Sequence, residues 1–217
     1  MLLGKGQLVN NLEKALSTLC EDAELTAALA AVLAYASKTG RISYSEVTEI
    51  VGYDPDEVLL LGNKWRLLLP ARVERSGAWE DRLLLCKPGE SYELPNIIRY
   101  MVRSASKTGC LASMSAIAEV FREIEEQAWQ HMPELIDELW KKARNYRISA
   151  EQIREICVRF GLGERVDALI AELKATGVMS PKLGSLAEIS RAGSPLYELN
   201  PLLFIEKREK SASAEMA

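Results

Sequence analysis

The sequence predicts a mainly helical protein that contains a repeated helical unit. The segment ASKTG occurs twice without change, at residues 36–40 and 105–109, each time after an apolar run and before a Ser-led stretch. A second repeat, Arg-Ile-Ser, occurs at residues 41–43 and 147–149 and precedes a helix-like stretch both times. Between these repeats, apolar residues recur at three- and four-residue steps, which is typical of amphipathic helices. The repeats therefore predict units of similar structure.

Local signals place the first helices. Apolar periodicity predicts a helix over residues 8–20. An alanine-rich run predicts a second helix over residues 23–40, which ends in a glycine that can adopt the left-handed conformation of a C-cap. A short helix then begins after Ser43 or Ser45, either of which can cap it, and ends at Gly52.

A third helix of this unit and a hairpin should follow. Asp54 is the expected N-cap, and the proline after it stands at the first helical position, where a missing N–H costs nothing. Beyond this helix the pattern predicts two strands, over residues 71–75 and 81–86, joined around Ser76 and Gly77. The first unit thus reads as three helices and a hairpin.

A later unit repeats this order. A helix over residues 133–146 precedes the second Arg-Ile-Ser segment, and another over residues 163–177 follows the next short helix. Two strands are predicted at residues 178–180 and 196–199. This copy matches the first more clearly than the ASKTG copy between them.

The middle copy lacks a hairpin. It predicts two helices, over residues 94–107 and 113–130, and the second carries an apolar stripe. The stripe is either a core face or a surface for a partner. Its members are Ile117, Val120, Phe121, Ile124 and Ala128.

In this order of elements the chain resembles the winged-helix superfamily of helix-turn-helix proteins, over residues 24–88 and again over residues 133–205. The resemblance implies a mainly α fold in which tandem winged-helix modules, each a helix-turn-helix plus a β-hairpin wing, are joined by a helical linker. We expect an N-terminal helix (1–23), winged-helix module 1 (24–90), a helical linker and candidate dimerisation region (91–132), module 2 (133–205) and a flexible tail (206–217).

The resemblance also implies a choice between two kinds of partner. In most members the third helix enters the DNA major groove and the wing touches the backbone or the minor groove. A minority are protein-interaction modules, as in chromosome-condensation and membrane-trafficking complexes. Fold alone does not decide between these uses.

The expected third helix and wing of module 1 carry side chains that suit DNA. Asn and Arg can form paired hydrogen bonds with base edges in the major groove, and wing arginines can contact phosphates. Between residues 62 and 75, four basic residues stand against one acidic residue. Asp56 and Glu57 count against DNA at the start of the same helix, where they could instead complement the helix dipole. The predicted nucleic-acid-binding residues are Asn63, Lys64, Arg66, Arg72, Arg75 and Arg82.

The third helix of module 2 is less suited to DNA. It offers Glu164, Asp167 and Glu172 beside Arg165 and Lys174, which leaves no net positive face. We expect module 2 to contact protein, either module 1 or another subunit.

Composition limits the function classes further. The formal net charge is -4 and the pI is about 5.3, so there is no whole-molecule positive field to attract nucleic acid. The four cysteines lie far apart and His131 is the only histidine, which argues against a zinc site. Neither a GxSxG segment nor a P-loop is present. We therefore expect no enzymatic activity, no metal and no cofactor.

The same sequence argues against a membrane location. The apolar start is too short for a signal peptide, and no apolar run approaches the roughly 20 residues needed to span a bilayer. We expect a cytoplasmic protein.

These observations support two hypotheses. The first is a DNA-binding transcriptional regulator, with module 1 reading double-stranded DNA and with a homodimer formed to match two half-sites. The alternative is a tandem winged-helix protein–protein interaction scaffold that does not bind DNA directly and meets its partner through the helical linker or module 2.

Overall fold

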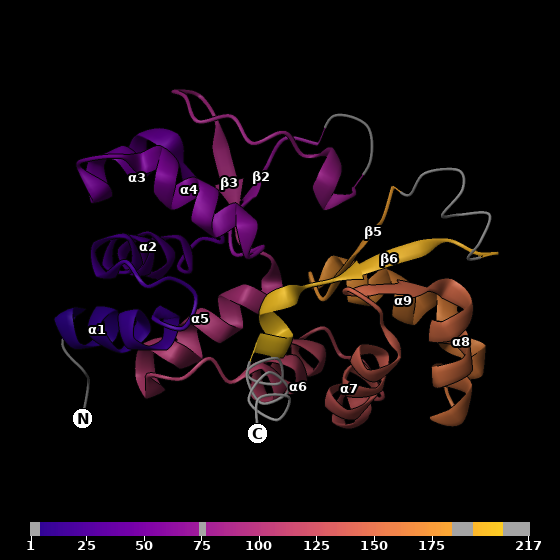
Figure 1. Ribbon diagram of the computed structural model, residues 1–217. Helices are drawn as coiled ribbons and strands as arrows, with labels where there is room; N and C mark the ends of the chain where they lie inside the picture. The colour runs from indigo at the N-terminus through magenta and orange to yellow at the C-terminus, as the bar shows by residue number, and fades with distance from the viewer. Residues whose placement is uncertain (1–4, 74–76, 184–192, 206–217) are drawn as a thin grey trace, which may run out of the picture.

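Two small antiparallel sheets lie in opposite halves of a mainly helical molecule (Figure 1). The structure is a computed structural model and describes residues 5–73, 77–183 and 193–205. Each sheet has three strands, and in each the last strand along the chain lies between the other two. Among the described residues, no helix is long and apolar enough to cross a membrane.

The first half contains four helices and one sheet. Unit 1 is our name for α2 to β3 in this half. The elements are α1 (Lys5–Leu16), α2 (Ala23–Ala36), β1 (Arg41–Ser43), α3 (Tyr44–Val51), α4 (Pro55–Lys64), β2 (Leu69–Pro70), the 3₁₀ helix η1 (Trp79–Asp81) and β3 (Ser91–Glu93).

The second half begins with two linker helices and ends with a second sheet. Unit 2 is our name for α7 to β6. The elements are α5 (Asn96–Thr108), α6 (Ser113–Glu123), η2 (Trp129–His131), α7 (Met132–Lys142), β4 (Arg147–Ser149), α8 (Ala150–Arg159), η3 (Gly163–Arg165), α9 (Val166–Ala175), β5 (Met179–Pro181), β6 (Leu196–Leu199) and η4 (Pro201–Phe204).

The predicted serine cap of the first short helix is confirmed, and the second has the same kind of cap. Ser43, rather than Ser45, caps α3 and forms a reciprocal capping box with Glu46. Ser149 does the same for α8 with Gln152. Both Arg-Ile-Ser segments therefore end at the serine that starts a helix.

The hairpin predicted for the first half is wrong. Residues 71–73 and 82–86 form no strand; residues 74–76 lie outside the described residues. The ladder instead pairs β2 with β3 and β3 with β1. The prediction followed local β-propensity, whereas burial favours the later segment: Tyr92 in β3 is buried and its hydroxyl donates to the Leu85 carbonyl.

The second hairpin was predicted more closely. The strand over residues 196–199 is confirmed as β6, and β5 lies one residue later than expected. The two sheets share one register, because Arg41, Ile42 and Ser43 pair with Glu93, Tyr92 and Ser91 while Arg147, Ile148 and Ser149 pair with Glu198, Tyr197 and Leu196.

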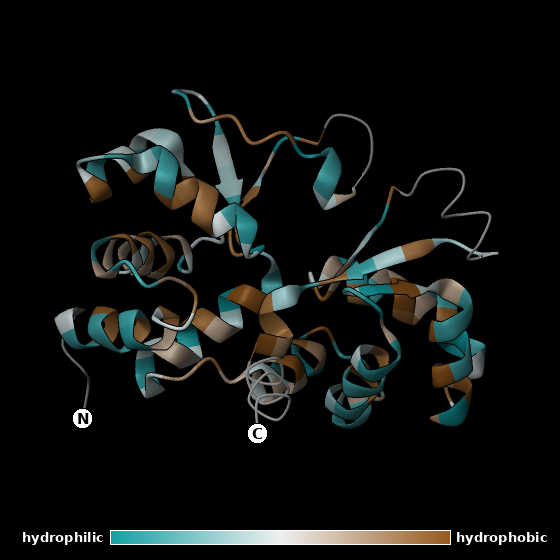
Figure 2. Ribbon diagram, in the orientation of Figure 1, coloured by the Kyte–Doolittle hydropathy of each residue, from teal (hydrophilic) through white to brown (hydrophobic). Residues whose placement is uncertain are grey.

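The linker helix α6 is shorter than expected and its apolar stripe is internal. It ends at Glu123, and Glu125 has a positive φ of 60°. Ile117, Val120 and Phe121 are fully or nearly fully buried, whereas Ile124 is 42% exposed. The core interpretation of this stripe is therefore confirmed for its main part. Figure 2 shows the hydrophobic parts of α5, α6 and η4 meeting near the centre of the molecule.

The two ASKTG segments are matching helix ends. Gly40 and Gly109 adopt positive φ angles of 84° and 73°, and their N–H groups bond to Ala36 and Ala105 at 2.8 and 2.7 Å. This is the conformation for which glycine is favoured at a helix C-terminus.

Each ASKTG end is also held by a side chain from another helix. The guanidinium of Arg99 donates to the carbonyls of Ser37 and Lys38, both at 2.9 Å. In the second copy, the Asn11 amide donates to the carbonyls of Ser106 and Lys107 at 3.1 and 3.3 Å. The motif therefore joins α2 to α5 and α5 to α1, because orphan carbonyls at a helix end need donors.

Candidate protein-docking surface and its surroundings

Helix α4 has a narrow solvent face with one large apolar side chain. Glu57, Leu60 and Lys64 are exposed along it, and Leu60 is 58% exposed. Asp54 caps the helix by accepting from the Glu57 N–H. The opposite side of the helix buries Val58, Leu59 and Leu61.

Arg66, predicted to contact DNA, is engaged within the chain. Its Nη2 lies 3.2 Å from Oε1 of Glu198 in β6, and these side chains are 19% and 17% exposed. Its guanidinium also lies over the ring of Trp79, 5.7 Å from the centroid. A charge-assisted hydrogen bond in a partly buried place holds an arginine firmly. Arg66 therefore ties unit 1 to unit 2.

The other predicted DNA-binding residues are divided. Arg82 bonds to Glu93 and to the Pro70 carbonyl, so it belongs to the sheet of unit 1. Asn63 is half-buried, whereas Lys64 and Arg72 are exposed. Arg75 lies outside the described residues.

The connection between β2 and β3 reaches across to unit 2. The Trp79 N–H donates to Oγ of Ser180 at 2.9 Å, and the Glu80 carboxylate accepts from the Lys182 ammonium and the Leu183 N–H. Lys182 lies 3.7 Å from Glu198 as well. A polar network thus joins the β2–β3 connection of unit 1 to β5 and the residues that follow it in unit 2.

Half of the exposed large apolar side chains belong to one stretch of the sequence, from the turn before α4 to the β2–β3 connection. Of the eight large hydrophobic residues that are exposed in the described ranges, half lie just before α4, on it, or between β2 and β3. Exposed aromatic and large aliphatic side chains can anchor a protein interface. They are Tyr53, Leu60, Val73 and Leu83.

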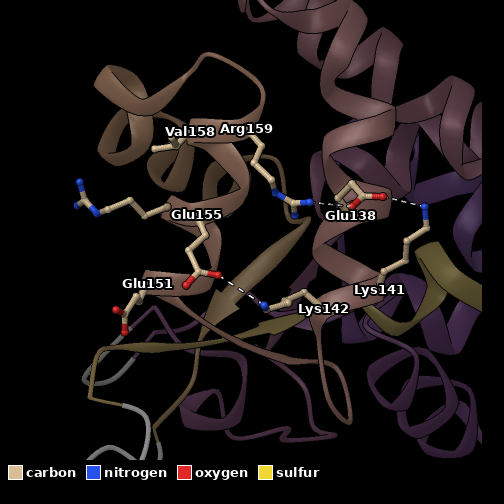
Figure 3. A pocket seen from close by; sticks show the side chains of 8 residues that line it. Glu138, Lys141, Lys142, Glu151, Glu155, Val158 and Arg159 are labelled. Atoms are coloured by element: carbon tan, nitrogen blue, oxygen red, sulfur yellow. Dashed lines mark hydrogen bonds and ion pairs between the residues drawn. The ribbon is translucent and has the colours of Figure 1, made fainter.

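A hollow between α7 and α8 is lined mostly by charged side chains (Figure 3). Its volume is about 730 Å³. Lys142 pairs with Glu155 at 3.5 Å, and Glu138 pairs with Lys141 at 2.8 Å and Arg159 at 3.7 Å. Because most of the charges are matched within the hollow, it presents little uncompensated charge to a ligand.

A pair of carboxylates lies where the linker meets unit 2, with Glu126 buried and Glu172 half-buried. Glu126 has no exposed side-chain surface and accepts two bonds from Arg165, at 2.6 and 2.8 Å. Burial, together with the neighbouring Glu126, raises the pKa of Glu172 to about 7. Burial acts to raise the pKa of Glu126 too, but bonds with Glu172, Arg165 and the Ala128 N–H outweigh it and lower the pKa. The cluster ties the linker to α9.

No arrangement of metal ligands appears in the parts of the chain that the structure describes, where no three His, Cys, Asp or Glu side chains gather suitably. The cysteines at 20, 86, 110 and 157 are free thiols.

Sequence reasoning missed Glu93 and Glu198, which organise the ion pairs of the two sheets. The signal was present as a third repeat, because Tyr-Glu-Leu occurs at residues 92–94 and 197–199. Aligning these segments would have placed β3 at its observed position.

The chain matches the model of a protein family over residues 10–209. Because the match spans most of the chain, the protein belongs to that family. The match includes both units and the linker. No curated protein and no solved structure shows significant similarity to the chain.

Proposed function

We propose that this chain is a tandem winged-helix protein that works as a protein–protein interaction scaffold, with α4 and the β2–β3 connection as its docking surface. The element order supports the winged-helix part: in each unit a helix, a strand, two helices and two strands follow one another, and the last strand lies in the middle of the sheet. This is the order of the superfamily to which the sequence bears its resemblance.

The character of the α4 face is the observation that carries the scaffold function. A helix that reads the major groove presents Arg, Lys, Asn or Gln to base edges. The solvent face of α4 presents Glu57, Leu60 and Lys64, and Arg66 is held by Glu198. An exposed leucine flanked by opposite charges favours a protein partner.

A capture experiment tests the scaffold function. Tagged protein is incubated with nuclease-treated extract at moderate salt, and retained proteins are identified for the wild type and for Leu60→Lys. Ala171→Lys is the matched control, because Ala171 is exposed at the equivalent sixth position of α9. We expect partners to be lost with Leu60→Lys and kept with Ala171→Lys. Equal retention by both variants would remove α4 from the docking surface.

DNA-binding regulation of transcription is the second candidate, and the exposure of Lys64 and Arg72 favours it. Its test is a titration into labelled random-sequence duplexes at low and near-physiological salt. A DNA reader would bind with a steep salt dependence, and each lost phosphate contact would reduce the salt slope by about 1. Under the scaffold function we expect weak binding that Lys64→Ala and Arg72→Ala leave unchanged.

A further inference from the structure

The two charges on the solvent face of α4 lack ion-pair partners among the described residues. Glu57 lies in the first turn and Lys64 in the last, seven positions apart. This spacing corresponds to roughly 10 Å along the helix axis, too far for the two side chains to pair with each other. Leu60 lies between them, so the face reads acidic, apolar and basic along its length.

Such a face is complementary to itself. If two copies of α4 lie antiparallel about a two-fold axis beside Leu60, Glu57 of each helix lies at the height of Lys64 in the other, because both are nearly equally far from the axis. The two Leu60 side chains then meet at the centre. A two-fold interface needs this property, since the same patch serves both subunits.

We propose that a second copy of this chain occupies the outer face of α4, in an antiparallel α4–α4 pair centred on Leu60 with two Glu57–Lys64 ion pairs. This proposal rests on the proposed function and names a partner for the same surface.

The equivalent face of unit 2 lacks this pattern. The positions of α9 that correspond to Glu57, Leu60 and Lys64 are alanines 168, 171 and 175. The nearest acidic residue on that helix, Asp167, lies 3.8 Å from Arg154. Self-association through the third helix is therefore a property of unit 1 alone. The α6 stripe, which the sequence offered for a dimer, is mostly buried within the chain.

The dimer should be weak. One exposed leucine and two surface ion pairs form a contact at the low end of specific interfaces, so we expect dissociation in the micromolar range. Sedimentation velocity over a micromolar concentration series should show the mass rising from 24.1 kDa toward twice that value. Leu60→Lys should remain monomeric at every concentration, and Ala171→Lys should associate like the wild type.

A charge swap tests the pairing itself. Glu57→Lys and Lys64→Glu should each weaken the dimer by about tenfold, because each replaces two attractions with two repulsions. The double variant restores opposite charges and should recover wild-type association. Each swap also places a charge unfavourably for the helix dipole, and these two destabilising effects would add in the double variant. Recovery of the dimer by the double variant would therefore come from the restored ion pairs.

Three results would overturn the proposal: a wild type that stays at 24.1 kDa throughout the series, a Leu60→Lys variant that still dimerises, or a double variant that is not restored. Its failure is distinct from failure of the scaffold function. A monomeric protein whose extract partners are lost with Leu60→Lys keeps the docking surface and loses only the second copy as its occupant.

Discussion

Glu93 and Glu198 occupy the same place in the two units but hold different partners. Each lies in the central strand of its sheet, opposite the arginine of an Arg-Ile-Ser segment. Glu93 pairs with Arg41 and Arg82, both within unit 1. Glu198 pairs with Lys182 of its own half and, in addition, with Arg66 of the other unit. The equivalent glutamate therefore pairs only within its unit in the first copy, according to the ion pairs described, and also joins the two units in the second.

The ends of the third helices differ in a related way. Aligning α4 with α9 places Arg66 opposite Gly177, and both have positive φ, 56° and 81°. Arg66 accepts an unfavourable backbone conformation and gains the contact with Glu198. Gly177 lies against Pro95, and a Cβ there would be 2.3 Å from the proline ring. Arg66 therefore forms a contact with the other unit at the end of α4, whereas Gly177 allows close packing at the end of α9.

Substitutions in the core should have the largest effect, and they test whether the two sheets contribute equally to stability. Ile42 and Ile148 are each 1% exposed and each pairs with a tyrosine. Changing either to alanine should lower the free energy of unfolding by about 2–5 kcal/mol, because each leaves a cavity. Urea unfolding of both variants measures this. A large loss for one and none for the other would show that the sheets are not equivalent in stability.

Gly177→Ala tests whether the end of α9 depends on close packing against Pro95. We expect a loss of about 2–4 kcal/mol, from the left-handed backbone and from the overlap with Pro95. Gly52→Ala is the control, because Gly52 has a φ of 76° and open space around it. It should cost only about 1–2 kcal/mol. Equal thermal unfolding of the two variants would exclude tight packing at Pro95.

The carboxylate pair between the linker and unit 2 should give the second half of the molecule a pH dependence that unit 1 lacks. The pKa of Glu172 is about 7, above its ordinary value of 4.5. The folded state therefore binds more protons than the unfolded state between these values, and stability falls as pH rises through this window. Glu172→Gln should flatten the profile and stabilise the protein above pH 7 by on the order of 1–3 kcal/mol.

Unfolding measured from pH 4.5 to pH 8 provides this comparison, and Glu164→Gln, at an exposed position, serves as control. A Glu172→Gln variant that retained the wild-type slope would contradict the raised pKa of Glu172.

Loss of the Arg66–Glu198 ion pair between the units should have the smallest effect on stability. In a double-mutant cycle, Arg66→Met and Glu198→Gln should show a coupling energy of about 1 kcal/mol, because the pair is only partly desolvated. Small-angle scattering should also show the single variants to be more extended. Glu93→Gln, which removes the equivalent carboxylate within unit 1, should leave the overall dimensions unchanged.

Local signals predicted the helices and caps well, because a cap depends on residues three or four positions away. Asp54 was identified as a cap for that reason, and Ser43 was one of two candidates. The first hairpin was mistaken because β2 has only two residues and pairs with a strand that follows a long connection. The role of Arg66 could not be predicted locally, since its partner lies 132 positions later.

The position of α1 has a consequence for how the chain is made. This helix packs on α2 and α5, so the whole of unit 1 lies between α1 and one of its supports in the sequence. Leu12 and Leu16 are fully buried in the finished molecule. During synthesis from the N-terminus, this apolar face stays incompletely covered until α5 has left the ribosome. Unit 1 and the linker therefore complete their folding together. A nascent chain that stops before residue 96 exposes an apolar surface to which chaperones can bind.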